Sequence, residues 1–536
     1  MKKKFFALCL ALAMAVTCFT ACNKDETVQS GELGKVTTTD TYPQETDITL
    51  RHWGVLDSGL LSSCTNYGET DMAKWLEEAT GIKVKYEHPV AGQEEAAFNI
   101  MISSDDMPDL INWQWTTYPG GPDKAIEEGI ITRLNDYFEK VSPNLMKLLD
   151  EHPEWNAAIM TDAGNYFQYP MIKEDNKLLT YFSYFIRKDL LDKAGMDVPV
   201  TLADWEKVLY KFRDMGVEVP LSVRINNDYI QTFGPFMGCF GIMGDFYQMD
   251  GKVKFGPYEE AFRDYVELLA KWYKDGILDK EFADTDSKRR AALASNGRVG
   301  AIEGTIGGDC GRWLSAITPE SGIELIPVTV PVLNEGDRPM WTQATPAVGS
   351  STAIAASSKH KELAARYLDY GYSQEGYILN NFGKENVTFT MKEKDGRMIP
   401  TYMDWMYDSE KNGGFTFSEC LAFYTRANGG PCVQSVDYIE QNYSQKIQRD
   451  ALNKVDSDVL KYMLPEVYMT NEEQKTYSDI MTPVNTYRDE TIAKIISGKM
   501  PLGELENYYA QLKKLGIEKA IEIKQAAYDR YLERLG

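Results

Sequence analysis

The early part of the chain alternates between strand-like and helix-like patterns of hydrophobic positions. Segments 47–54, 82–89 and 109–113 carry apolar side chains at alternate positions or as a short apolar run, which is typical of strands. Between them, 70–81 places apolar residues on one helical face before a glycine, and 94–104 is also predicted to be helical. This β-α-β-α-β order predicts a parallel sheet with right-handed crossovers.

Tryptophans stand at the carboxyl ends of these predicted strands. Trp53 ends the first strand and Trp113 the third, so both are expected at the rim where open α/β sheets bind ligands. Trp115 would face the same side as Trp113 if the strand continued. The rings are either ordinary core aromatics or a platform in a ligand cleft, and the pattern alone leaves both readings open.

A second unit of strands and helices begins near the aromatic strand 178–187. Thr201 then caps a long amphipathic helix, with Asp204 in the capping-box position. The segment 247–256 predicts a hairpin that turns at an Asp-Gly pair. The last part of the chain is predicted to be mostly helical.

The amino terminus is predicted to be a lipoprotein signal. Lys2–Lys4 precede an apolar stretch that is too short to span a membrane, which takes about 20 apolar residues. Residues 1–21 end in Phe-Thr-Ala before Cys22, which resembles the lipobox of bacterial lipoproteins, although phenylalanine stands where leucine is usual. The polar segment 22–46 is predicted to be a flexible tether. A plain secreted protein is the alternative.

Charge and cysteine content exclude several classes of partner. A formal net charge of −23 argues against nucleic acid, whose phosphates need Lys and Arg, and against anionic surfaces in general, while a local basic pocket stays possible. Beyond the signal, the odd number of cysteines and the lack of a CxxC pair argue against a zinc or redox framework. One or two disulfides stay open.

The common catalytic and cofactor motifs are missing from the sequence. The 4 histidines are far apart and show no metal-site spacing. The glycine-rich stretch GAIEGTIGGDCG lacks the lysine of a phosphate loop, and no calcium-loop pattern is found. We therefore expect no cofactor and no metal. With 80 acidic residues, a glycosidase-type carboxylate pair stays open as an alternative.

Several long segments resemble the extracellular solute-binding proteins (family 1) of carbohydrate ABC importers. They are 185–214 (FIRKDLLDKAGMDVPVTLADWEKVLYKFRD), 271–304, 357–390 and the ending 493–536. The last two look like the long lipoprotein branch described as LplA-like or LipO-like. The resemblance extends over nearly the whole mature chain and does not specify the substrate.

The resemblance implies a periplasmic-binding-protein-like fold: two doubly wound α/β lobes joined by a hinge, with added C-terminal helices. It implies a lipid-anchored, monomeric protein on the extracytoplasmic face of the cell membrane that captures a carbohydrate between the lobes and delivers it to ABC importer permease subunits. Abundant tyrosine and tryptophan favour an oligosaccharide. The expected parts are an N-terminal lobe (47–175), a C-terminal lobe (176–344), a return to the first lobe (345–400), and a helical end in the C-terminal lobe (401–536).

Candidate ligand contacts follow from the strand ends and from the family's usual contact regions. Asp57 follows the first strand as a possible hydroxyl acceptor, Glu303 lies where a strand opens into a loop, and Tyr184 lies in the aromatic strand, where core packing is the competing interpretation. The full set comprises Trp53, Asp57, Trp113, Trp115, Tyr184, Asn226, Asn227, Phe233, Glu303 and Trp341.

Two other functions compete with sugar capture. An extracellular carbohydrate-active enzyme would need a carboxylate pair in its cleft and would release product. A binding protein for a peptide or another solute cannot be separated from a sugar-binding protein by composition.

Overall fold

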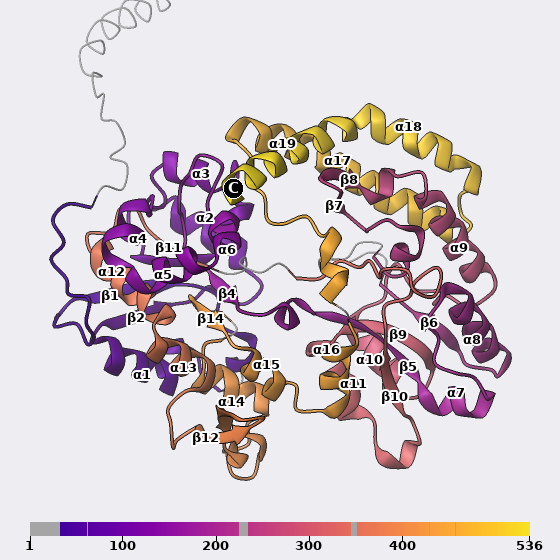
Figure 1. Ribbon diagram of the computed structural model, residues 1–536, viewed down its shortest axis with the longest axis horizontal. Helices are drawn as coiled ribbons and strands as arrows, with labels where there is room; N and C mark the ends of the chain where they lie inside the picture. Colours follow the sequence, from indigo (N-terminus) through magenta and orange to yellow (C-terminus); the bar gives the residue numbers. More distant parts are fainter. Residues whose placement is uncertain (1–32, 62, 225–233, 345–350, 428, 456) are drawn as a thin grey trace, which may run out of the picture.

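The computed structural model of the protein describes residues 33–536, apart from 62, 225–233, 345–350, 428 and 456. Its sheets lie in two α/β lobes placed side by side, and long C-terminal helices run across the top of both in the view of Figure 1. The expected mixed α/β architecture with two lobes is confirmed.

The first lobe is built on a four-stranded sheet with the order β11-β3-β1-β2. β1 pairs in parallel with both β2 and β3, and β11 runs antiparallel to β3. The predicted β-α-β-α-β order is thus confirmed. Its elements are β1 (Thr49–Trp53), α1 (Asp71–Thr80), β2 (Lys83–Glu87), α2 (Glu94–Ile102), β3 (Leu110–Trp113) and β11 (Ser351–Ile354).

The second lobe has a four-stranded sheet with the order β10-β5-β9-β6. β6 and β9 are parallel, whereas β5 is antiparallel to both its neighbours. Thr201 and Asp204 form the predicted capping box at the start of α8. The elements are β5 (Phe182–Arg187), α7 (Lys188–Ala194), α8 (Leu202–Asp214), β6 (Val219–Ser222), α9 (Phe262–Lys274), α10 (Ser287–Ser295), β9 (Val299–Thr305), α11 (Gly308–Ala316) and β10 (Leu325–Val328).

The predicted hairpin is also present, as β7 (Phe246–Met249) and β8 (Lys252–Phe255). Its turn residues Asp250 and Gly251 both have positive φ, at 50° and 80°, which is the backbone that an Asp-Gly turn provides. The sequence was sufficient to predict this hairpin because the Asp-Gly turn sets the register in which β7 and β8 pair.

Residues 401–442 lie with the first lobe, which differs from the expected boundary at 400. β14 pairs in parallel with β4 of the first lobe. Phe382 and Tyr402 share one hydrophobic core with Tyr438, so this segment continues the return through the first lobe. The chain reaches the second lobe again at Tyr443, just before α16, where its side chain joins a core of that lobe. The elements are β4 (Met171–Lys173), α12 (Lys361–Asp369), α13 (Gln374–Phe382), β12 (Phe389–Lys394), β13 (Arg397–Tyr402), α14 (Phe417–Tyr424), β14 (Cys432–Gln434), α15 (Val436–Asn442) and α16 (Lys446–Lys454).

The C-terminal helices contact both lobes. Val484 and Ile492 of α17 (Asn471–Ile496) join the core of the second lobe. At the other side, Tyr528 of α19 (Ile517–Leu535) packs with Ala157 of the first lobe. The yellow helices α18 (Leu505–Leu515) and α19 can be followed in Figure 1 from the second lobe to the first. The remaining helices, all in the first lobe, are α3 (Gly121–Glu127), α4 (Asn135–Val141), α5 (Pro143–Glu151) and α6 (Pro153–Ile159).

Ion pairs reinforce this helical connection. The carboxylate of Asp162, in the first lobe, is buried and accepts hydrogen bonds from Arg530 at 2.5 Å and from Arg534 at 2.6 Å. Arg530 also pairs with Glu473 at the start of α17. A buried carboxylate is stable when it is paired in this way, so the network fixes α19 to the first lobe.

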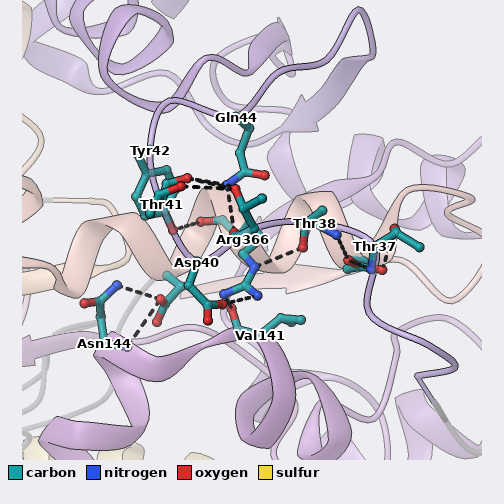
Figure 2. A network of polar contacts seen from close by, with 12 residues as sticks. Thr37, Thr38, Asp40, Thr41, Tyr42, Gln44, Val141, Asn144 and Arg366 are labelled. Atoms are coloured by element: carbon teal, nitrogen blue, oxygen red, sulfur yellow. Dashed lines mark hydrogen bonds and ion pairs between the residues drawn. The ribbon is translucent and has the colours of Figure 1, made fainter.

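Residues 33–46, which we call the strap, lie against the first lobe, whereas a flexible tether was expected up to residue 46. Figure 2 shows Arg366 of α12 between the strap and the lobe. Its guanidinium donates to Thr38 Oγ1 and to the carbonyl of Val141, and it forms an ion pair with Asp40. The strap has no hydrophobic periodicity because polar and backbone hydrogen bonds hold it, and that is why its sequence resembles a linker.

A glycine lets the strap approach α1 closely. The amide of Gln44 donates to the carbonyl of Thr80 at 2.7 Å. Gly81 ends α1 with φ of 71°, and a Cβ atom there would lie 2.2 Å from the Gln44 carbonyl oxygen. Only glycine satisfies both requirements, the left-handed backbone and the close approach.

Two further findings concern membrane spans and disulfides. Among the residues that the structure describes, no helix combines the length and the apolar composition needed to cross a membrane. Cys64, Cys239, Cys310, Cys420 and Cys432 are all buried free thiols, so the disulfides left open by the sequence are not formed between them.

The strap should loosen when its central arginine is removed. Arg366→Gln removes charge-assisted hydrogen bonds, each worth about 1.5–3 kcal/mol, so we expect at least about tenfold faster amide hydrogen exchange between Thr37 and Gln44. Lys384→Gln, which breaks an exposed ion pair with Glu78 on the same lobe, is the control and should leave the strap unchanged. Equal exchange in both variants would show that Arg366 does not hold the strap.

Candidate functional site

A cavity of about 930 Å³ lies at the carboxyl ends of β1, β2 and β3. The segments that follow these strands form most of its wall. The rest of the wall comes from residues distant in sequence, at the end of α14 and beyond: Leu421, Ala422, Thr425, Arg426 and Gly429. The site therefore lies where the predicted parallel sheet would place it.

Trp113 is half-buried and lines this cavity. Its ring stacks on Phe98 of α2, with centroids 4.3 Å apart and planes 9° apart, and it also contacts Trp53. Trp53 is only 6% exposed and lies in the core behind. Trp53 and Phe98 thus hold Trp113 in a fixed orientation, with part of its ring facing the cavity.

Trp115 faces the interior, unlike Trp113, and has no exposed surface. β3 ends at Trp113, and the 3-10 turn η3 (Trp115–Thr117) begins two residues later. The alternation expected from a continuing strand therefore stops, and the indole packs against Phe98 and Tyr118. Its side chain leaves no surface that a ligand could contact.

Polar side chains complete the cavity. Asp57 is exposed and caps the 3-10 turn η1 (Ser58–Leu60) by accepting from the amide of Gly59 at 2.7 Å. The ring of His88 is held between Gly54 O, at 2.8 Å from Nδ1, and the amide of Tyr67, which donates to Nε2 at 3.1 Å. Accepting at Nε2 requires the neutral ring, and burial correspondingly lowers the pKa of His88.

Sequence reasoning missed several residues of this cavity, among them His52, Tyr67, Asn112 and Arg426. His52 and Asn112 directly precede the two tryptophans that end β1 and β3, so the strand-end rule could have found them. Arg426 lies more than three hundred positions away, and no local signal connects it to the strand ends.

Two candidates of the second lobe belong to its core. Tyr184 and Trp341 are each 1% exposed, and their rings lie 4.5 Å apart. The Tyr184 hydroxyl accepts from the amide of Phe236 at 2.9 Å. β5 has a neighbour on each side and all six of its residues are buried, which explains why Tyr184 is almost fully buried. The side chain therefore belongs to the core, which was the competing interpretation.

Glu303 is part of a buried charge network at the carboxyl ends of β6 and β9. Its Oε1 accepts from the amide of Arg224 at 2.9 Å and lies 3.2 Å from Nη1 of Arg290. Arg224 also forms an ion pair with Asp309. Glu303 is therefore a neutralising partner of buried arginines in this conformation. The candidates Asn226, Asn227 and Phe233 follow Arg224 and lie outside the described residues.

The described residues include no group of three or more His, Cys, Asp or Glu side chains arranged to hold a metal ion. The chemistry that the cavity offers is an aromatic face together with hydrogen-bonding groups. This combination suits a ligand with both apolar and polar surfaces.

Comparison with known proteins gives one consistent result. The sequence pattern of the family described as "Bacterial extracellular solute-binding protein" matches residues 65–378. The fructooligosaccharide ABC transporter substrate-binding protein FusA of Streptococcus pneumoniae is 25% identical over 491 residues, which cover 85% of this chain and 86% of FusA. Lipoprotein LipO of Bacillus subtilis is 25% identical over 415 residues, 73% of this chain and 74% of LipO.

Solved structures share the fold. FusA in complex with kestose matches with a TM-score of 0.70 and 22% identity, covering 91% of this chain and 100% of that one. A protein from Bifidobacterium longum infantis, described as an HMO binding ABC-transporter associated solute binding protein, matches with a TM-score of 0.71 and 18% identity, covering 90% of this chain and 99% of that one. Because the family pattern spans more than half of the chain and the two-lobed fold agrees with it, this protein belongs to the bacterial extracellular solute-binding proteins.

Proposed function

We propose that this protein is a lipid-anchored receptor that captures an oligosaccharide and delivers it to the membrane permease of an ABC importer. The observation that carries the proposal is the cavity at the carboxyl ends of the first sheet, with the half-buried Trp113 in its wall. Its relatives include a fructooligosaccharide-binding protein and a polygalacturonan/rhamnogalacturonan-binding protein.

The lining of the cavity suits a sugar. The C–H faces of a sugar ring stack on an aromatic plane, and Trp113 provides one that is already oriented by Phe98. Hydroxyl groups require hydrogen-bonding partners, which Asp57 and Asn112 can supply. A volume of about 930 Å³ is at the upper end of ordinary ligand pockets, which favours a ligand of several rings.

The proposed contacts divide by position. Trp113 and Asp57 are direct contacts, and Trp53 supports Trp113 from behind. Asn226, Asn227 and Phe233 are proposed contacts from the second lobe, where Glu303 acts by holding Arg224 rather than by touching the ligand. We do not propose Trp115, Tyr184 or Trp341 as contacts, because their side chains are enclosed in the cores.

Transport requires that the bound state differ from the free one. A ligand that both lobes contact favours the closed arrangement, and a permease can recognise that arrangement. The receptor acts as a monomer in this scheme, because the cavity is formed within one chain.

The cavity favours binding over glycoside hydrolysis. Its carboxylates, Asp57 and Glu94, both accept hydrogen bonds from backbone amides, those of Gly59 and Gly92. The bond from Gly92 lowers the pKa of Glu94. A glycosidase acid needs the opposite, a raised pKa that keeps its proton available at neutral pH.

Trp113→Ala should weaken oligosaccharide binding by about tenfold or more. The lost stacking is worth roughly 0.5–1.5 kcal/mol, and lost burial adds to it. Titration calorimetry with an oligosaccharide selected by thermal shift from fructo-, malto- and xylo-oligosaccharides measures the effect. Trp115→Ala is the matched control, which should cost about 3–5 kcal/mol of stability while its folded fraction binds normally. Normal affinity in Trp113→Ala would remove Trp113 from the site.

The lipid anchor is tested at Cys22. Cys22→Ala should move the protein from the membrane fraction to the soluble fraction, because lipidation needs the thiol. Cys18→Ala, a thiol of the same leader, should remain in the membrane fraction. Unchanged fractionation of Cys22→Ala would refute the anchor.

Binding without turnover is the third expectation. An oligosaccharide that stabilises the purified protein should remain intact after long incubation, as measured by chromatography. Products in excess of one per protein molecule, absent from a mock purification, would assign the protein to the carbohydrate-active enzymes instead.

A further inference from the structure

Arg426 is a cation built into the cavity wall. It follows α14, and its backbone amide donates to the carbonyl of Asn380 at 2.8 Å, which fixes the start of its side chain. The side chain is half-buried and lines the cavity. Gly430 leaves room for it, since a Cβ atom there would lie 2.6 Å from Cδ and Nε of Arg426. The local chain is thus arranged around this arginine.

The guanidinium of Arg426 has no carboxylate partner among the described residues. Its side-chain contacts are the Tyr367 hydroxyl, to which Nη1 donates at 3.4 Å, and the ring of Tyr67, whose centroid is 5.8 Å from Cζ. Arg290 and Arg366, which are fully buried, both have an acid beside them, Glu303 and Asp40. Arg426 is only half-buried and faces the cavity, so its counter-charge can come from a ligand in the cavity instead of from the protein.

Other polar side chains near Arg426 also lack a partner in the described part of the protein. His52 is 5% exposed, and neither of its ring nitrogens has a hydrogen-bond partner among the described residues. The Tyr67 hydroxyl also lacks one, while the Tyr86 hydroxyl is bonded to Tyr367. Burial and the charge of Arg426 lower the pKa of His52 well below its usual value, so the ring is neutral and can donate one hydrogen bond. Two polar side chains without hydrogen-bond partners among the described residues, each able to donate one hydrogen bond, therefore lie at this end of the cavity.

The acids of the same cavity do not neutralise Arg426. Asp57 and Glu94 accept hydrogen bonds from the amides of Gly59 and Gly92, and neither forms an ion pair with Arg426. One end of the cavity therefore contains a cation and polar groups without partners within the described chain. The carboxylates of the cavity are bonded to backbone amides instead of to this cation.

We propose that the oligosaccharide carries a carboxylate, as a uronic acid does, and that Arg426 binds this carboxylate with the Tyr67 hydroxyl as a second donor. The proposal rests on the proposed function and names the class of sugar for that same cavity. The planar fork of a guanidinium matches the two oxygens of a carboxylate, and the missing counter-charge would come from the ligand. The net charge of −23 does not oppose this, because repulsion between distant charges is screened within about 8 Å at physiological salt.

Oligogalacturonate and its fully methyl-esterified form make a matched pair of probes, since the ester removes the charge and keeps the sugar rings. Titration calorimetry should show that the wild-type protein binds the acid at least tenfold more tightly than the ester. In Arg426→Gln this preference should disappear through loss of affinity for the acid, with the ester little changed. Arg426→Lys, which keeps the charge without the fork, should lie between the two.

Arg213→Gln controls for the change in net charge, because Arg213 is a half-buried arginine of the second lobe that pairs with Asp214 and does not line the cavity. It should bind both probes as the wild type does. The melting temperature of ligand-free Arg426→Gln should not fall, because the variant removes a cation without a counter-charge; a large fall would show that the arginine is structural and would overturn the proposal. Equal binding of acid and ester, or stabilisation by neutral oligosaccharides alone, would also overturn it while leaving the proposed function intact. If no oligosaccharide of either kind binds, the proposed function itself fails.

Discussion

The parallel register of β1, β2 and β3 is the constraint on which the site depends. Trp53, the last residue of β1, pairs with Ile111, so β3 continues for two residues beyond the end of β1. Trp113 therefore projects past Trp53 and stays partly exposed, while Trp53 is covered by it and by Phe98. A shift of register would change how far Trp113 projects beyond Trp53, so pairing in the sheet decides which of the two tryptophans can meet a ligand.

The carboxyl ends of the two sheets are used differently. In the first lobe, the cation Arg426 faces an open cavity with tyrosines and a neutral histidine around it. In the second lobe, Arg224, which follows β6, and Arg290 of α10 are neutralised internally by Glu303 and Asp309. The arginine charges of the second lobe are thus already compensated within the protein, whereas Arg426 can still gain a counter-charge from a ligand.

The sequence predicted those features whose causes are local. The alternating strands of the first lobe, the Thr201–Asp204 capping box and the Asp-Gly hairpin depend on neighbours within a few positions, and all are present. The orientation of Trp115 depends on where β3 ends, which periodicity does not encode. Arg426 and the lobe of residues 401–442 depend on contacts between distant segments, and the strap on hydrogen bonds of a polar segment without any pattern. The expectation that ligands bind at the carboxyl ends of parallel strands located the cavity correctly. Which side chains line the cavity depends on tertiary packing, which the sequence pattern does not show.

The attachment of α19 to both lobes has a mechanical consequence. Asp162 holds Arg530 and Arg534 in the first lobe, while the neighbouring helix α17 is part of the core of the second. α17 also contacts α3 of the first lobe, so the C-terminal helices connect the two lobes at one edge of the molecule. A rearrangement of the lobes that keeps these contacts would leave this edge in place, and the largest displacement would then occur at the opposite edge.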